Sequence, residues 1–115
     1  MQLTRVLEQD VTILAVSGTV KLGESAQHFA AELQDIFDTT PGGVLIDLSQ
    51  IDHLDSTGIG ELVGYLQKFG QAKRRVALFR PHKRIESLLK LTRLDSVFST
   101  YWEKDEALRY LSGKE

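Results

Sequence analysis

A run of carboxylate, hydroxyl and imidazole side chains lies between positions 47 and 57 of the chain. The members that could do chemistry are Asp47, Ser49, Asp52, His53, Asp55, Ser56 and Thr57. The segment Asp55–Gly58 has the composition of a helix start, where backbone N–H groups lack partners and the helix dipole is positive. A hydroxyl at such a position suits a phosphate group. We therefore interpret Ser56 as a site whose charge can be added and removed.

Two other chemistries are compatible with the same residues. The aspartates at 47, 52 and 55 could bind Mg²⁺ at the carboxyl end of a strand. We favour the alternative that Asp55 caps a helix and that Asp47 accepts hydrogen bonds from nearby N–H groups. A Ser56–His53–Asp55 triad is disfavoured, because neighbours in one tight loop rarely align as base and nucleophile. We expect no metal and no catalytic residue.

The remaining histidines and glycines do not point to an enzyme. His28 and His82, like His53, stand apart from any partner at metal-ligand spacing. We interpret His28 as a surface residue and His82 as a helix cap or partner contact. The chain has neither a Walker-type phosphate loop nor a glycine-rich dinucleotide turn. We expect no cofactor, and a small enzyme or nucleotide-binding domain stays open only as a third interpretation, which a nucleotide-binding assay would decide.

Composition predicts one globular domain spanning residues 1–115. The 115 residues are 42% hydrophobic and 26% charged, and they include no cysteine. These values are typical of a domain with its own apolar core and exclude disulfide chemistry. The first residues lack the pattern of a signal peptide, and no apolar stretch is long enough to insert directly into a membrane. We expect a cytoplasmic protein.

Charge is distributed unevenly along the chain. The range 68–93 holds nine basic residues and one acid, whereas the rest is strongly acidic. Such a segment can steer an acidic protein face or anionic lipid headgroups, or it can be a solvated surface. Few aromatic residues are interleaved and the sequence pI is about 5.9. We therefore expect no nucleic-acid partner.

Periodicity predicts alternating strands and helices. We expect two strands joined at Gln9-Asp10 as a hairpin, with Gly18 ending the second. Apolar spacing and turn residues place the later elements. The expected strands are 2–8, 11–17, 44–48, 75–79 and 97–101, and the expected helices are 24–37, 56–70, 82–91 and 104–111. The order β-β-α-β-α-β-α-β-α predicts an α/β fold, with a mixed sheet of four or five strands covered by about four helices.

Two of the predicted helices carry further signals. The helix from Ser56 has Gly60 and Gly64 four positions apart, which leaves a flat surface for close packing or for a docking partner. The helix from His82 has inward positions that we assign to Ile85, Leu88, Leu89 and Leu91.

The stretch Asp47–Ile59, D-L-S-Q-I-D-H-L-D-S-T-G-I, resembles the STAS family, the domain of anti-sigma factor antagonists that also occurs in sulfate transporters. The family pattern is a strand ending D-L-S, a short apolar turn and D-S-[ST]-G-[LIV] opening a helix. The similarity extends over nearly the whole chain, including Gly18 and the late Glu106-Ala107-Leu108. It implies a STAS-like fold.

The resemblance also implies a regulatory cycle. A serine kinase that is also the anti-sigma factor would phosphorylate Ser56, with Thr57 as a secondary candidate and Asp55 as the adjacent acid. The unphosphorylated protein would bind that factor and free a sigma factor, and a PP2C-type phosphatase would reset the switch. Lys21 stands where the family often has an acid on the partner-facing edge.

We accordingly expect a partner-switching phosphoprotein in transcription regulation. Its expected partner-binding residues are Lys21, Asp55, Ser56, Thr57, Gly58, Gly60, Glu61 and Gly64. Added phosphate charge beside Asp52, Asp55 and Glu61 would repel an acidic partner and weaken binding roughly 10- to 100-fold. The alternative is a STAS subunit of a transporter complex that binds an ABC-type ATPase. A weak homodimer stays open.

Overall fold

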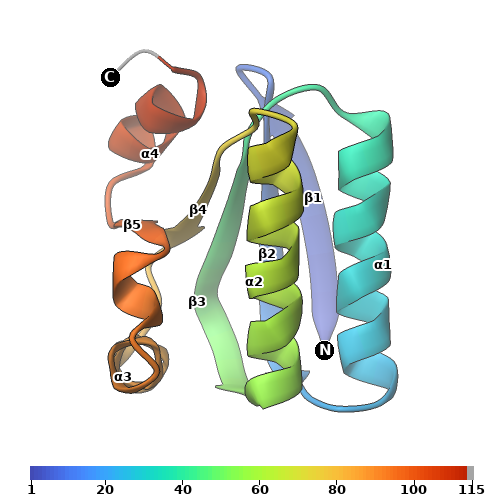
Figure 1. Ribbon diagram of the computed structural model, residues 1–115, viewed down its shortest axis with the longest axis vertical. Helices are drawn as coiled ribbons and strands as arrows, with labels where there is room; N and C mark the ends of the chain where they lie inside the picture. Colours follow the sequence, from blue (N-terminus) through green and yellow to red (C-terminus); the bar gives the residue numbers. More distant parts are fainter. Residues whose placement is uncertain (114–115) are drawn as a thin grey trace.

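The computed structural model describes residues 1–113 as a five-stranded sheet with four α-helices (Figure 1). A one-turn 3-10 helix, Leu94–Ser96, precedes the last strand. The strands are β1 (Gln2–Glu8), β2 (Val11–Val20), β3 (Val44–Leu54), β4 (Val76–Phe79) and β5 (Ser99–Tyr101). The helices are α1 (Glu24–Thr39), α2 (Ser56–Gln71), α3 (Lys83–Leu91) and α4 (Lys104–Leu111). The predicted α/β class and element order are confirmed.

The sheet has the strand order β1-β2-β3-β4-β5. β1 and β2 pair antiparallel through the predicted hairpin, whose turn residues Gln9 and Asp10 have φ values of 53° and 66°. Positive φ at both positions is characteristic of the two-residue turn that matches strand twist. All other neighbouring strands pair in parallel. The carboxyl ends of β2, β3 and β4 therefore lie at one edge of the sheet, where α2 and α3 begin (Figure 1).

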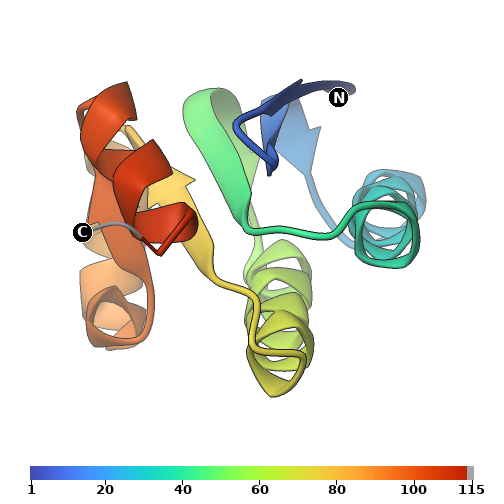
Figure 2. The ribbon, with the colours of Figure 1, turned by 90° about the horizontal axis from the view of Figure 1, so that it is seen from above.

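Helices cover the two faces of the sheet unequally. The larger core joins α1, α2 and α3 to one face, through side chains such as Phe29, Leu62 and Ile85. Figure 2 shows α1 and α2 on the same side of the sheet. On the other face, Ala107 and Leu108 of α4 pack in a second core of six buried residues. The first core fixes the relative positions of α2 and α3.

Two strands are longer than the sequence predicts. β2 continues through Gly18, which has φ of +86°, to Val20. β3 continues past Ser49 to Leu54, where we expected a loop, and it pairs with the end of β2. Register shifts interrupt this pairing, and such bulges break the two-residue alternation from which strands are predicted. As a result a single residue, Asp55, separates β3 from α2.

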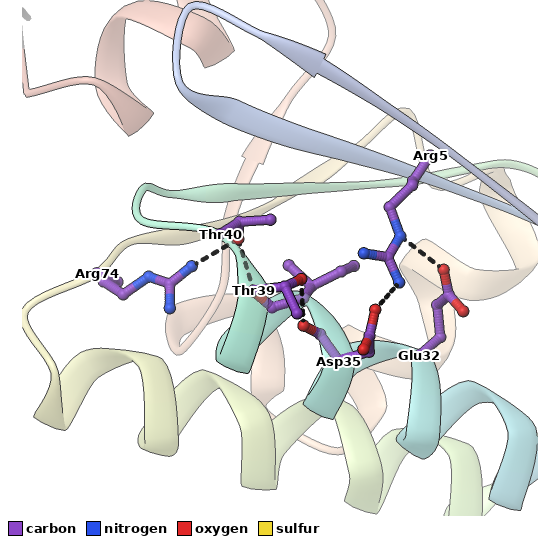
Figure 3. A network of polar contacts seen from close by, with 7 residues as sticks. Arg5, Glu32, Asp35, Thr39, Thr40 and Arg74 are labelled. Carbon is purple, nitrogen blue, oxygen red and sulfur yellow. Dashed lines mark hydrogen bonds and ion pairs between the residues drawn. The ribbon is translucent and has the colours of Figure 1, made fainter.

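Polar contacts tie the outer elements to the core (Figure 3). Arg5 of β1 forms ion pairs of 2.8 Å with both Glu32 and Asp35 of α1. The Arg74 guanidinium donates to the carbonyls of Gly42 and Phe37 and to the Thr40 hydroxyl, at 2.7–2.9 Å. These contacts fix the edge strand and the connections at the end of the sheet opposite Ser56.

The orientation of Leu91 differs from our prediction. Ile85 and Leu89 of α3 are buried, whereas Leu91 is 83% exposed. A residue two positions after Leu89 lies about 200° further round the helix, and so on the opposite face. Leu91 therefore points into solvent at the end of α3.

Candidate functional site

Asp55 joins three segments at the start of α2. Its Oδ1 accepts a hydrogen bond of 3.0 Å from the Gly58 N–H, the predicted N-cap. Its Oδ2 accepts one of 2.8 Å from the Leu22 N–H, in the loop between β2 and α1. Its own N–H donates to the Val20 carbonyl at 3.2 Å. The β2–α1 loop is thereby held against the helix start.

Hydrogen bonding also shifts the acidity of this carboxyl group. The N–H groups of Gly58 and, to a smaller extent, Leu22 hold the pKa of Asp55 below its ordinary value, with weaker contributions from Thr57 and His53. Donors to a carboxylate favour its charged form. The negative charge of Asp55 is therefore already engaged by the backbone that surrounds it.

Ser56 is the first residue of α2 and its side chain is exposed. Within the described residues 1–113, its hydroxyl has no hydrogen-bond partner. Thr57 is half-buried beside it. The structure thus places a free hydroxyl where a helix begins, as the sequence predicts, and leaves the adjacent one less accessible.

The three glycines of the first α2 turns have different surroundings. A Cβ on Gly58 would lie 2.5 Å from Leu54 Cδ1 and 3.0 Å from Val20 Cγ1, so this buried glycine allows the helix to pack on β2 and β3. A Cβ on Gly60 or Gly64 would meet nothing within 4 Å. Gly58 therefore lets the start of α2 pack closely on the strands. Gly60 and Gly64 are exposed and form, with Ser56, one stripe along the surface of α2.

The other predicted partner-binding residues border this stripe. Glu61 is half-buried in the second turn of α2. Lys21 is exposed in the β2–α1 loop next to Leu22, whose side chain is 76% exposed. The Ser25 hydroxyl accepts a hydrogen bond of 2.9 Å from the Lys21 N–H, which orders the loop. The structure brings Lys21 to the same edge as Ser56, through the contact of Leu22 with Asp55.

A groove of about 530 Å³ lies between the start of α2 and α3. Its lining is mainly apolar and comprises His53, Leu54, Asp55, Ser56, Arg84, Ile85, Ser87, Leu88 and Leu91. Ser56 is thus flanked by two exposed leucines, Leu22 of the loop and Leu91 of α3. We did not predict the groove or either leucine as part of the site. The groove and Leu91 depend on how α3 packs against the core, and Leu22 depends on the contact of its loop with Asp55.

The alternative chemistries are not assembled around these residues. Oδ1 of Asp47 accepts hydrogen bonds from the N–H and hydroxyl of Ser49, at 2.9 and 2.7 Å, as favoured above. His82 Nε2–H donates to the Ile51 carbonyl at 2.6 Å, so this side chain ties α3 to β3. Both oxygens of Asp55 bind backbone N–H groups, and none of its hydrogen bonds orients His53 toward Ser56. Across the part of the chain that the structure describes, no group of three or more acids and histidines forms a metal site.

The basic segment is divided by the fold. Lys68, Arg74, Arg75 and Arg80 make internal contacts, of which the last is a 2.7 Å hydrogen bond from Arg80 Nε–H to the Trp102 carbonyl. Lys83, Arg84 and Lys90 remain exposed on α3. The helix that forms one wall of the groove therefore carries three of the exposed cations, whereas Lys73 and Arg93 are exposed outside it. None of the helices within residues 1–113 has the length and apolar character needed to cross a membrane.

Comparison with known proteins gives consistent matches. The model of the STAS domain family matches residues 3–107. A candidate anti-sigma factor antagonist of Thermotoga neapolitana is 29% identical over 107 residues, which cover 92% of this chain and 94% of the relative. Anti-sigma factor antagonists are a regulatory rather than an enzymatic family, in agreement with the prediction from the sequence.

Two solved structures show the same fold. The crystal structure of a candidate anti-sigma factor antagonist from Thermotoga maritima has a TM-score of 0.81 at 24% identity, covering 95% of this chain and 93% of that one. The Bacillus cell fate determinant SpoIIAA in its phosphorylated form has a TM-score of 0.71 at 14% identity, covering 95% of this chain and 97% of that one. At these identities the structures support the architecture alone.

Proposed function

The chain belongs to the STAS domain family, and we propose that it acts as an anti-sigma factor antagonist. In this proposal the unphosphorylated protein binds an anti-sigma factor that is also a serine kinase, and so frees a sigma factor. The observation that carries the proposal is the exposed, unpartnered Ser56 hydroxyl at the first position of α2, beside an uncrowded surface. The similarity to named antagonists over nearly the full chain supports the same class of partner.

The surface around Ser56 has the features of a protein-docking site. The stripe of Ser56, Gly60 and Gly64 lets a partner backbone approach closely, because no side chain projects from either glycine. Leu22 and Leu91 flank this stripe and offer apolar anchors. Lys21 lies on the same edge and adds a positive charge toward an acidic partner.

Phosphorylation would act at the centre of this surface. The Ser56 Oγ attacks the γ-phosphorus of ATP, the bond to ADP breaks, and the hydroxyl proton passes to a base of the kinase. The helix start tolerates the added charge of about −1.5 to −2, so the fold survives modification. A PP2C-type phosphatase would hydrolyse the ester and restore the binding form. Modification therefore changes docking without unfolding the protein.

The test is incubation with ATP and a candidate serine kinase of the anti-sigma factor type, followed by intact-mass analysis. The expected result is the gain of one phosphoryl group, which Ser56→Ala abolishes and Thr57→Ala does not. Ser56→Ala should also bind the kinase persistently, whereas Ser56→Asp should bind it roughly 10- to 100-fold more weakly. An unmodified protein that instead binds an ABC-type ATPase would establish the transporter alternative.

A further inference from the structure

Arg84 is an exposed cation in the groove beside Ser56. It lies in the first turn of α3 and lines the groove together with Ser56 and His53. Within residues 1–113 its guanidinium forms no hydrogen bond or ion pair. Arg80, by contrast, donates to a backbone carbonyl and stacks on Phe79. Arg84 is therefore a guanidinium available for an anion in the groove.

The charged groups around the groove leave Arg84 without an acidic partner. From the residue before α2, Asp55 faces the groove, but both of its oxygens accept backbone N–H groups. From the end of β3, His53 lines the same groove, and Asp52 lines a neighbouring hollow with Arg84 without pairing to it. Lys21 lies beyond Asp55 on the β2–α1 loop. An anion on Ser56 would thus meet a cation that is paired with no carboxylate of residues 1–113.

We propose that Arg84 is the internal receptor for a phosphate group on Ser56. Guanidinium binds phosphate oxygens through two parallel N–H donors, and the long arginine side chain can reorient across the groove to reach them. The pair would bridge α2 and α3 over an apolar floor that includes Ile85 and Leu88. Phosphorylation then closes the groove to a partner, which is a more specific effect than repulsion by nearby acids. The inference rests on the proposed modification of Ser56.

The experiment is a ³¹P NMR pH titration of the full chain with phosphoserine incorporated genetically at position 56. Its second pKa, ordinarily about 6, should be lower in the wild-type background, because a nearby cation favours the doubly charged phosphate. Arg84→Gln should raise it by about half a unit or more, an approximately threefold change in the acid dissociation constant. Lys83→Gln removes the same charge from the adjacent exposed position outside the groove, and it should leave the phosphate pKa unchanged.

Because His53 lines the same groove and an imidazole can carry a positive charge, each comparison is repeated in a His53→Gln background. Equal phosphate pKa values with and without Arg84, or an equal shift with Lys83→Gln, would overturn the assignment of Arg84. Since the phosphoserine is installed without a kinase, the result is independent of whether a kinase modifies Ser56. A failure of the proposed function would appear in the mass analysis and not in this titration.

Discussion

The backbone N–H of Leu22 donates to Oδ2 of Asp55 at 2.8 Å, while Oδ1 of the same carboxylate caps α2. One side chain therefore joins a loop and a helix that are far apart in the sequence. Leu22 makes one of these contacts itself, and Ser56 directly follows Asp55 in the chain. Asp55 therefore determines the relative positions of the exposed Leu22 side chain and the Ser56 hydroxyl. Its role at the site is to position groups that a partner would contact.

Asp55 gives the stability a defined dependence on pH. Its pKa is lower in the folded protein than the value of about 3.9 in an unfolded chain. The stabilisation is therefore fully present above about pH 4 to 5, and it is lost as the pH falls through the folded pKa. Asp55→Asn should therefore make the unfolding free energy less dependent on pH in this range. Urea denaturation between about pH 2 and 6 measures this dependence.

The matched control for that measurement is Asp52→Asn. Asp52 is an exposed aspartate near the end of β3 whose carboxylate has no hydrogen bond within residues 1–113. Asp52→Asn should leave the decrease of unfolding free energy at low pH close to that of the wild type. If the unfolding free energy of Asp55→Asn falls with decreasing pH as steeply as that of the wild type, the hydrogen bonds from the Gly58 and Leu22 N–H groups are not the cause of the pH dependence.

Gly58 and Gly60 should respond oppositely to alanine. At Gly58 the new methyl group would meet Leu54 and Val20 at 2.5 and 3.0 Å, and we expect a loss of about 1–3 kcal/mol. At Gly60 it enters open space, and helix propensity should stabilise the fold by up to about 1 kcal/mol. Chemical denaturation of the two variants measures both effects. A stabilising Gly58→Ala would contradict the close packing of α2 on the strands.

Arg74 should not be replaceable by lysine. Its guanidinium donates to three oxygens from Phe37, Thr40 and Gly42 and stacks on Phe69, while burial lowers its pKa. Lysine keeps the charge but cannot reproduce the planar set of donors. Arg74→Lys should therefore cost about 1–3 kcal/mol of unfolding free energy.

Lys90→Arg is the control for this substitution, because Lys90 is exposed on α3 and its ammonium group forms no polar contact within the described residues. It should change the unfolding free energy by less than about 0.5 kcal/mol. Equal stability of Arg74→Lys and the wild type would show that the carbonyl contacts of Arg74 contribute little.

The start of α2 could be predicted from the sequence because it depends on local composition. Asp55, Ser56 and the following glycine define a helix cap within four residues, and the structure confirms the cap. The end of β3 could not be predicted in the same way. Ile51 and Leu54 are buried three positions apart, since a bulge interrupts the alternation. A prediction based on two-residue alternation therefore ends β3 too early.

The groove could not be predicted because its walls come from segments that are distant in sequence. Arg84 and Leu91 lie in the same groove as Ser56 only because α3 packs on the shared core. The role of the basic segment, residues 68–93, was ambiguous for the same reason. Counting charges does not distinguish Arg74, whose guanidinium donates to backbone carbonyls, from Arg84, whose guanidinium is available for an anion. Tertiary packing assigns different roles to residues of the same type.

Leu22 and Leu91 should contribute to docking without contributing to the fold. Both side chains are largely exposed, at 76% and 83%. Leu91 lines the groove with Ser56, and the Leu22 N–H binds the adjacent Asp55. Truncating an apolar anchor typically weakens a protein interface by about 1 kcal/mol or more, whereas an exposed side chain adds little to folding. Leu22→Ala and Leu91→Ala should each bind the serine kinase that modifies Ser56 at least about 5-fold more weakly, measured by isothermal titration calorimetry.

Leu7→Ala is the matched control, because Leu7 is also exposed, at 62%, but lies on the edge strand β1 away from the groove. It should bind the kinase like the wild type, and all three variants should unfold at nearly the same urea concentration. Weakening by Leu7→Ala to the same degree would place the interface on the sheet edge instead. Unchanged binding by both Leu22→Ala and Leu91→Ala would remove the apolar anchors from the proposed docking surface and leave Ser56 and the glycine stripe to account for recognition.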